Sequence, residues 1–242
     1  MEPNRRLPLG GGFSIYVSDR HTFGTDAILL SQFAAPKPRD RICDLGTGCG
    51  ILPLLWLRDR TLLSPIDGVD IQPDACALFE KSLRENHWEG RAAAVCGDLR
   101  ALPLPMGRYG LVTCNPPYRR PGCGKLCKDE GKNIARFELT CTISDAAKSA
   151  GRLLKTGGRF CLCHLPERLA DCMQAMRAAG IEPKRLRLVE QQAGCAPWLL
   201  LLEGIKGAKN GLQILPSLAL KQPDGRDTEE ARLLYAGFEA PS

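Results

Sequence analysis

The sequence has no uninterrupted run of about 18 apolar residues, the length that a membrane-spanning helix needs. The opening residues 1–6 are not followed by the apolar core of a secretory signal. We therefore expect a protein of the cytoplasm with no membrane partner. Internal repeats and long linkers are also missing, which favours one domain for the 242 residues.

The sequence has few histidines, and it has only one pair of cysteines with a spacing that could bind a metal. The three histidines, His21, His87 and His164, are expected to be surface or packing residues rather than catalysts. Of the 12 cysteines, only Cys123 and Cys127 share a polar, glycine-containing loop, and no second pair accompanies them. We therefore expect no metal site. Most other cysteines lie in apolar runs, where a reduced thiol behaves as a small hydrophobe.

The amino-acid composition predicts a soluble domain with a large hydrophobic core. Hydrophobic residues make up 44% of the chain, and the formal net charge is +6. A mildly basic chain suits a polyanionic partner without requiring one. Monomer and weak dimer both remain open.

Apolar runs of strand length alternate with runs of helical length through most of the chain. Strands are expected at 41–45, 66–71, 92–96, 111–114, 159–165, 184–189 and 198–203, and helices at 27–33, 51–57, 73–86, 144–154, 166–179 and 229–235. Such alternation predicts βαβ units with right-handed crossovers. The predicted fold is a Rossmann-like, doubly wound α/β domain with a seven-stranded, mostly parallel sheet and an antiparallel C-terminal edge strand.

The segments outside this alternation are expected to be accessory. Residues 1–36 would form a lid-like extension with a short strand or hairpin arm at 13–17, followed by the core at 37–207 and a tail at 208–242. Thr25 or Asp26 is expected to cap the helix that follows.

A glycine-rich turn follows the first core strand. Asp44 stands at the strand end, and Gly46, Gly48 and Gly50 follow, which lets a ligand approach the backbone closely. The spacing differs from that of dinucleotide binders, and the Gly-Lys-Ser/Thr ending of a phosphate-binding loop is missing. A carboxylate before the turn suits a ligand that carries an ammonium group, as S-adenosylmethionine does.

Two further acids follow the next two strands. Asp70 is placed to accept both hydroxyls of a ribose, and Asp98 to accept from an adenine amine. Each alone could be a solvated loop carboxylate. Because the carboxyl ends of parallel strands share one edge of a sheet, their succession after Asp44 predicts a common ligand site.

The fourth strand ends in Asn115-Pro116-Pro117-Tyr118. Two prolines cannot continue a sheet ladder, so the strand must stop in a stiff turn. The turn presents an amide, a free carbonyl and an aromatic ring, which suit a planar ring that bears an amine. The stretch is interpreted as a substrate clamp, against the alternative of a simple turn.

In this order, Asp44 to Gly50, Asp70, Asp98 and Asn115 to Tyr118 resemble class I S-adenosylmethionine-dependent methyltransferases that modify exocyclic or amide nitrogens. The stretches 23–30, 134–138 and 202–207 resemble the tRNA1(Val) adenine-37 N6-methyltransferase family more narrowly, although that family usually has His at the position of Phe137. The resemblance covers roughly residues 13–235.

The resemblance implies methylation of an adenine N6 in RNA, most specifically adenine 37 of a tRNA anticodon loop, with S-adenosylmethionine converted to S-adenosylhomocysteine. The implied catalytic residues are Asn115, Pro116, Pro117 and Tyr118. The implied cofactor-binding residues are Phe23, Thr25, Asp44, Gly46, Thr47, Gly48, Gly50, Asp70, Ile71, Asp98 and Leu99. Candidate contacts to RNA phosphates are Arg119, Arg120, Lys125, Lys128, Lys132 and Arg136.

The same clamp is compatible with other activities. Methylation of a protein glutamine at N5 and of ribosomal RNA guanine at N2 use similar chemistry. A non-catalytic RNA-binding scaffold is a more distant alternative, because every expected site residue is present.

Overall fold

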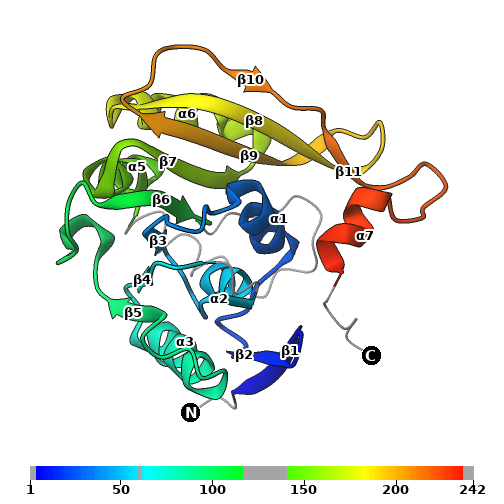
Figure 1. Cartoon of the computed structure of the whole chain (residues 1–242). Helices are drawn as coiled ribbons and strands as arrows, with labels where there is room; N and C mark the ends of the chain where they lie inside the picture. The colour runs from blue at the N-terminus through cyan, green and yellow to red at the C-terminus, as the bar shows by residue number, and fades with distance from the viewer. Residues whose placement is uncertain (1–3, 59–61, 117–140, 237–242) are drawn as a thin grey trace.

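The structure, a computed structural model, describes residues 4–58, 62–116 and 141–236. Within these ranges a nine-stranded sheet runs through the molecule in the order β10-β8-β9-β7-β6-β3-β4-β5, with β11 also paired to β8 (Figure 1). Its strands are β3 (Ile42–Leu45), β4 (Ile66–Asp70), β5 (Ala92–Cys96), β6 (Tyr109–Cys114), β7 (Leu154–His164), β8 (Ile181–Gln192), β9 (Pro197–Lys206), β10 (Gln213–Ile214) and β11 (Leu218–Lys221).

The pairing confirms the predicted α/β fold. Strands β3 to β7 pair in parallel, whereas β9 is antiparallel to both of its neighbours, β7 and β8. The last two core strands, β8 and β9, thus form an antiparallel pair. The sequence did not predict β10 and β11, two short strands that pair with β8 and extend the sheet beyond the expected seven strands.

Helices cover both faces of this sheet (Figure 1). They are α1 (Thr25–Ala34), α2 (Ile51–Arg58), α3 (Pro73–Glu85), α5 (Ile143–Leu153), α6 (Leu169–Ala178) and α7 (Glu229–Tyr235). A short 3-10 turn lies between β5 and β6, at Leu99–Ala101, and another directly precedes α6, at Pro166–Arg168. Each long helix lies within about two residues of its expected range, apart from the 3-10 start at Pro166.

Side chains alternate between two cores because successive residues of a strand point to opposite faces. Ile42 and Leu111 belong to the core that α1, α2 and α3 cover. Cys43 and Val112, one residue further along, belong to the core under α5 and α6. The sheet is therefore buried on both faces, as expected for parallel strands.

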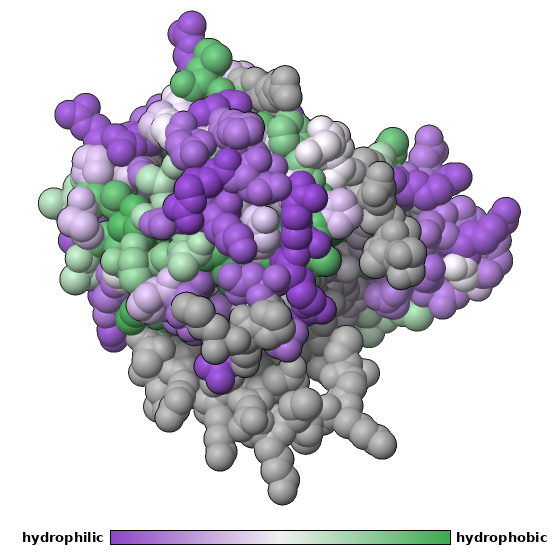
Figure 2. All heavy atoms as spheres, turned by 90° about the horizontal axis from the view of Figure 1, so that it is seen from below, coloured by the Kyte–Doolittle hydropathy of each residue, from purple (hydrophilic) through white to green (hydrophobic). Residues whose placement is uncertain are grey.

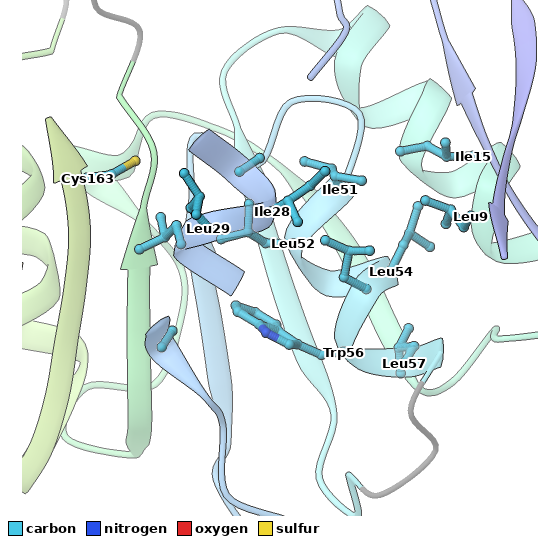
Figure 3. Close-up of a cluster of buried hydrophobic side chains, with 14 of the residues drawn as sticks. Leu9, Ile15, Ile28, Leu29, Ile51, Leu52, Leu54, Trp56, Leu57 and Cys163 are labelled. Atoms are coloured by element: carbon cyan, nitrogen blue, oxygen red, sulfur yellow. The ribbon is translucent and has the colours of Figure 1, made fainter. Parts of the chain in front are cut away.

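Helices α1 and α2 pack against each other over the first of these cores. Figure 3 shows Ile28 and Leu29 of α1 beside Leu52 and Trp56 of α2. The Trp56 indole N–H donates to the Ser31 carbonyl at 3.0 Å, so the two helices are also joined by a buried hydrogen bond. This contact fixes α1 against an element of the core.

A buried ion network fixes the C-terminal end of α1. The Glu203 carboxylate on β9 accepts from Arg159 at 3.1 Å and from Arg185 at 2.8 Å. The same guanidinium groups donate to the carbonyls of Ala34, at 2.7 Å, and Phe33, at 3.1 Å. Cations at a helix C-terminus complement its dipole and its unpaired carbonyls. We call Arg159, Arg185 and Glu203 the Glu203 network.

The expected arm at 13–17 is one half of a hairpin. Strands β1 (Arg5–Gly10) and β2 (Phe13–Val17) pair antiparallel, separate from the main sheet. The Asn86 side chain accepts from the Ser14 backbone N–H at 2.9 Å and donates to the Ser14 carbonyl at 2.7 Å. The hairpin is thereby held against the end of α3.

The predicted cap of α1 was wrong. Thr25 is already helical, the N-cap is Gly24 in an extended conformation, and no side chain caps this end. Asp26 instead lies in the first turn of α1, and its carboxylate accepts a hydrogen bond from a residue outside this helix.

On the face shown in Figure 2, hydrophilic residues cover most of the described surface and hydrophobic residues form small groups among them. Across the described ranges, no helix has the length and apolar character needed to span a membrane.

Candidate active site

The register of the sheet brings the four special loops to one edge. Leu45 pairs with Val69 on one side and with Cys114 on the other, while Asp70 pairs with Cys96. The turns after β3, β4, β5 and β6 therefore start side by side. This is the edge at which ligands bind in parallel α/β sheets.

The turn after β3 has the backbone that its glycines predict. Gly46, Gly48 and Gly50 have φ values of 70°, 56° and 84°, which side-chain-bearing residues rarely adopt. A Cβ at Gly46 or Gly48 would meet nothing within 4 Å, so this backbone is open to a ligand. A Cβ at Gly50 would lie 2.0 Å from the Phe79 ring, so this glycine serves packing. Thr47 is buried with its side chain against Gly68 of β4.

Asp44 lies behind this turn as a buried carboxyl, with 1% of its surface exposed. The Thr113 hydroxyl of β6 donates to its Oδ1 at 2.6 Å. Burial raises the pKa of Asp44 to about 7, and the Thr113 hydrogen bond only partly opposes this shift. Asp44 therefore changes charge near neutral pH.

This shift predicts a pH-dependent stability for the ligand-free protein. The pKa of Asp44 is about 7 in the folded protein and 3.8 in the unfolded chain. The protonated carboxyl therefore stabilises the fold fully below pH 3.8, and this stabilisation is lost as pH rises through 7. Buried His164, whose pKa is lowered to about 4, acts in the opposite direction. The difference between wild type and Asp44→Asn isolates the first effect.

We expect the wild type to lose stability relative to Asp44→Asn as pH rises from about 4 to 7. Urea unfolding of both proteins at several pH values measures this difference. Parallel profiles for the two proteins would show that Asp44 does not carry the shift.

Asp70 supports the glycine turn from the end of β4. Its carboxylate accepts from the backbone N–H of Gly48 and from that of Gln72, both at 2.9 Å. Each oxygen keeps a second lone pair that can accept a ligand hydroxyl. The next residue, Ile71, is 47% exposed at the same edge and offers an apolar surface.

Asp98, after β5, has a partner that the sequence did not predict. The Arg100 Nε donates to both carboxylate oxygens at 2.9 Å, and this hydrogen bonding lowers the pKa of Asp98. The Leu99 carbonyl accepts from Ser149 of α5. Asp98 is thus ionised, and an adenine amine would have to share its oxygens with Arg100.

Asn115, at the end of β6, is held by two side chains. Its amide nitrogen donates to Asp26 Oδ2 at 3.2 Å, and the Cys163 thiol donates to its amide oxygen at 2.9 Å. Asp26 belongs to α1 and Cys163 to β7. Asn115 and Pro116 are half-buried.

The remaining predicted residues divide into two groups. Phe23 packs against the core beneath α1, and the Thr25 hydroxyl oxygen accepts from the Tyr235 hydroxyl of α7 at 3.2 Å. Those outside the described residues are Pro117, Tyr118, Arg119, Arg120, Cys123, Lys125, Cys127, Lys128, Lys132, Arg136 and Phe137.

Comparison with known proteins identifies the family. Residues 11–165 match the family described as the methyltransferase small domain. The chain belongs to this family. The methyltransferase is also 31% identical over 209 residues to a protein of Tolumonas auensis named tRNA1(Val) (adenine(37)-N6)-methyltransferase, covering 86% of this chain and 85% of that relative. A relative of the same name from an Enterobacter species is 32% identical over 217 residues, with coverage of 89% and 86%.

The predicted membership of the tRNA1(Val) adenine-37 N6-methyltransferase family is thereby confirmed. A solved structure from Agrobacterium tumefaciens, described as a predicted O-methyltransferase, has a TM-score of 0.71 and 20% identity. It covers 90% of this methyltransferase and 98% of its own chain, which supports the fold alone.

Three residues of this methyltransferase's site were missed by sequence reasoning. Asp26 and Cys163 contact Asn115, and Thr113 contacts Asp44. Alternation along β6 and β7 could have shown which face Thr113 and Cys163 occupy. Nothing in the local sequence shows that α1 reaches Asn115.

Proposed function

We propose that this methyltransferase transfers a methyl group from S-adenosylmethionine to the N6 amine of an adenine in RNA, adenine 37 of a tRNA anticodon loop. The observation that carries the proposal is the position of Asn115. Its amide lies at the sheet edge that also carries Asp44, Asp70 and the open glycine turn. The names of the relatives from Tolumonas auensis and the Enterobacter species supply the nucleotide.

The residues at this edge fit S-adenosylmethionine. Ionised Asp44 would pair with its ammonium group, Asp70 would accept the ribose hydroxyls, and Ile71 would cover the adenine ring. The open backbone at Gly46 and Gly48 would allow the close approach that such a ligand needs. When bound, this cofactor supplies an electrophilic methyl group on a sulfonium.

The clamp would activate an amine that is a poor nucleophile, because the adenine ring delocalises its lone pair. The Asn115 amide oxygen and the Pro116 carbonyl would each accept one amine proton. These bonds favour a tetrahedral nitrogen and stabilise the positive charge that develops on it. The nitrogen–carbon bond forms as the carbon–sulfur bond breaks, and the extra proton then leaves to water. Tyr118 would stack on the base, as is common in recognition of unpaired RNA.

Nucleoside mapping tests this function. We expect tRNA from cells without the protein to lack N6-methyladenosine at position 37 of one tRNA species, and purified protein to restore it with S-adenosylmethionine. A transcript with guanine at position 37 is the control and should remain unmodified. Methylated guanine in place of methylated adenine, or no methylation of tRNA by the purified protein, would overturn the proposal.

A further inference from the structure

Asp26 contacts the clamp from a distant part of the chain. Its carboxylate lies 3.2 Å from the Asn115 amide nitrogen, across 89 positions of sequence. Asp26 is in the first turn of α1, whereas Asn115 follows β6. The contact therefore exists only because α1 is laid over the sheet.

The two partners of Asn115 select one orientation of its amide. The Asp26 carboxylate accepts from the NH₂ group at 3.2 Å, and the Cys163 thiol donates to the oxygen at 2.9 Å. Turning the amide over would set its oxygen against the Asp26 carboxylate. The observed orientation leaves the oxygen with one lone pair for an amine proton.

Helix α1, which carries Asp26, is held in place by hydrogen bonds along its length. At its C-terminal end, Arg159 and Arg185 of the Glu203 network bond its last carbonyls. In its middle, the Ser31 carbonyl accepts from Trp56, and at its start Thr25 bonds Tyr235. A carboxylate on an anchored helix is held more accurately than one on a loop.

We propose that Asp26 is a positioning residue, which holds the Asn115 amide oxygen toward the substrate amine. The inference rests on the proposed function of Asn115 as the acceptor of that amine. The Asp26 carboxylate also polarises the amide through its N–H, which makes the amide oxygen a stronger acceptor as charge develops on the substrate nitrogen.

A different explanation is that Asp26 only stabilises the N-terminus of α1, as first-turn acids do. Asp171 offers a matched control, because it occupies the first turn of α6 and pairs with Arg168 on the surface. A helix-end effect would appear equally in Asp26→Ala and Asp171→Ala. A positioning effect would appear only in the first.

The experiment measures steady-state methylation of the tRNA, S-adenosylhomocysteine binding by calorimetry and thermal unfolding for both variants and for Asp26→Asn. For Asp26→Ala we expect kcat to fall roughly 30- to 100-fold, as for a misplaced catalytic group. KM for tRNA and the Kd of S-adenosylhomocysteine should stay within about twofold of wild type. Asp26→Asn can still accept from Asn115, so it should lose less activity, and Asp171→Ala should match wild type.

Unchanged kcat in Asp26→Ala, or a loss confined to KM or cofactor binding, would overturn the proposal. If the alanine variant fails to fold, Asp26→Asn decides: full wild-type kcat in that variant counts against the positioning role, and a fall in kcat alone supports it.

A second measurement needs no RNA. In ¹⁵N-labelled protein, the side-chain amide signal of Asn115 is assigned with Asn115→Ala. We expect this signal to move in Asp26→Ala and to stay in place in Asp171→Ala. If wild type leaves the tRNA unmethylated, the proposed substrate is wrong and this signal alone decides: a shift supports the positioning role, and an unchanged signal overturns it.

Discussion

Asn115→Ala is expected to reduce kcat by roughly 10²- to 10³-fold, the usual cost of one group that stabilises transition-state charge. Under the proposed function, the Asn115 amide oxygen accepts one proton of the amine, and the alanine variant would leave only the Pro116 carbonyl to accept from it. Cofactor affinity should change little, because Asp44, Asp70 and the glycine turn lie on β3, β4 and the loops that follow them.

Steady-state methyl transfer to tRNA measures kcat, and calorimetry of S-adenosylhomocysteine measures cofactor affinity separately. Asn210→Ala is the control, since Asn210 is exposed and lies between β9 and β10. Wild-type turnover in Asn115→Ala would remove Asn115 from the chemistry. Equal losses of turnover and cofactor affinity would assign it to cofactor binding instead.

Glu203→Ala is expected to lower the free energy of unfolding by about 3–5 kcal/mol, as for a buried ion pair that loses one partner. Glu203 is 4% exposed and accepts from Arg159 and Arg185. In the variant, both arginines would keep their positive charge but lose the negative charge of Glu203. Arg159 would keep Asp40 at 3.2 Å, whereas Arg185 would keep only the Phe33 carbonyl among its described hydrogen bonds. The loss should therefore come mainly from Arg185.

Urea unfolding compares this variant with Glu80→Ala, which removes an exposed pair with Arg84 on α3. The control should cost no more than about 0.5 kcal/mol. A similarly small loss in Glu203→Ala would contradict the structural role of the Glu203 network. Because this network bonds the end of α1, the variant should also lose activity to the extent that Asp26 depends on α1.

The sequence predicted the parts of the site that follow from strand order. Asp44 lies near the end of β3, Asp70 ends β4 and Asn115 follows β6. Parallel register alone brings these strand ends together. Their assignment to cofactor and amine stays a prediction. The sequence likewise predicted the core strands, because buried parallel strands are short apolar runs bounded by turns.

The missed contacts depend on packing rather than on pattern. Asp26 was predicted to be a candidate N-cap of α1, because acidic residues are common at that position. In the structure α1 packs on α2, and the Asp26 carboxylate bonds Asn115 instead. Asp98 was predicted to be available to a ligand, but Arg100, two residues later, donates hydrogen bonds to both of its carboxylate oxygens. Strands β10 and β11 are only two and four residues long, which is too short for a clear sequence pattern, and they form because β8 offers an unpaired edge.

The position of β9 has a consequence for how the chain is synthesised. β9 lies between β7 and β8, although both precede it in the chain. A growing chain therefore exposes the facing edges of β7 and β8 until Lys206, the last residue of β9, has been made. At roughly 5–20 residues per second, these edges stay unpaired for seconds on the ribosome. Unpaired edges invite pairing with other chains, so the yield of this protein should depend on translation speed across residues 165–206.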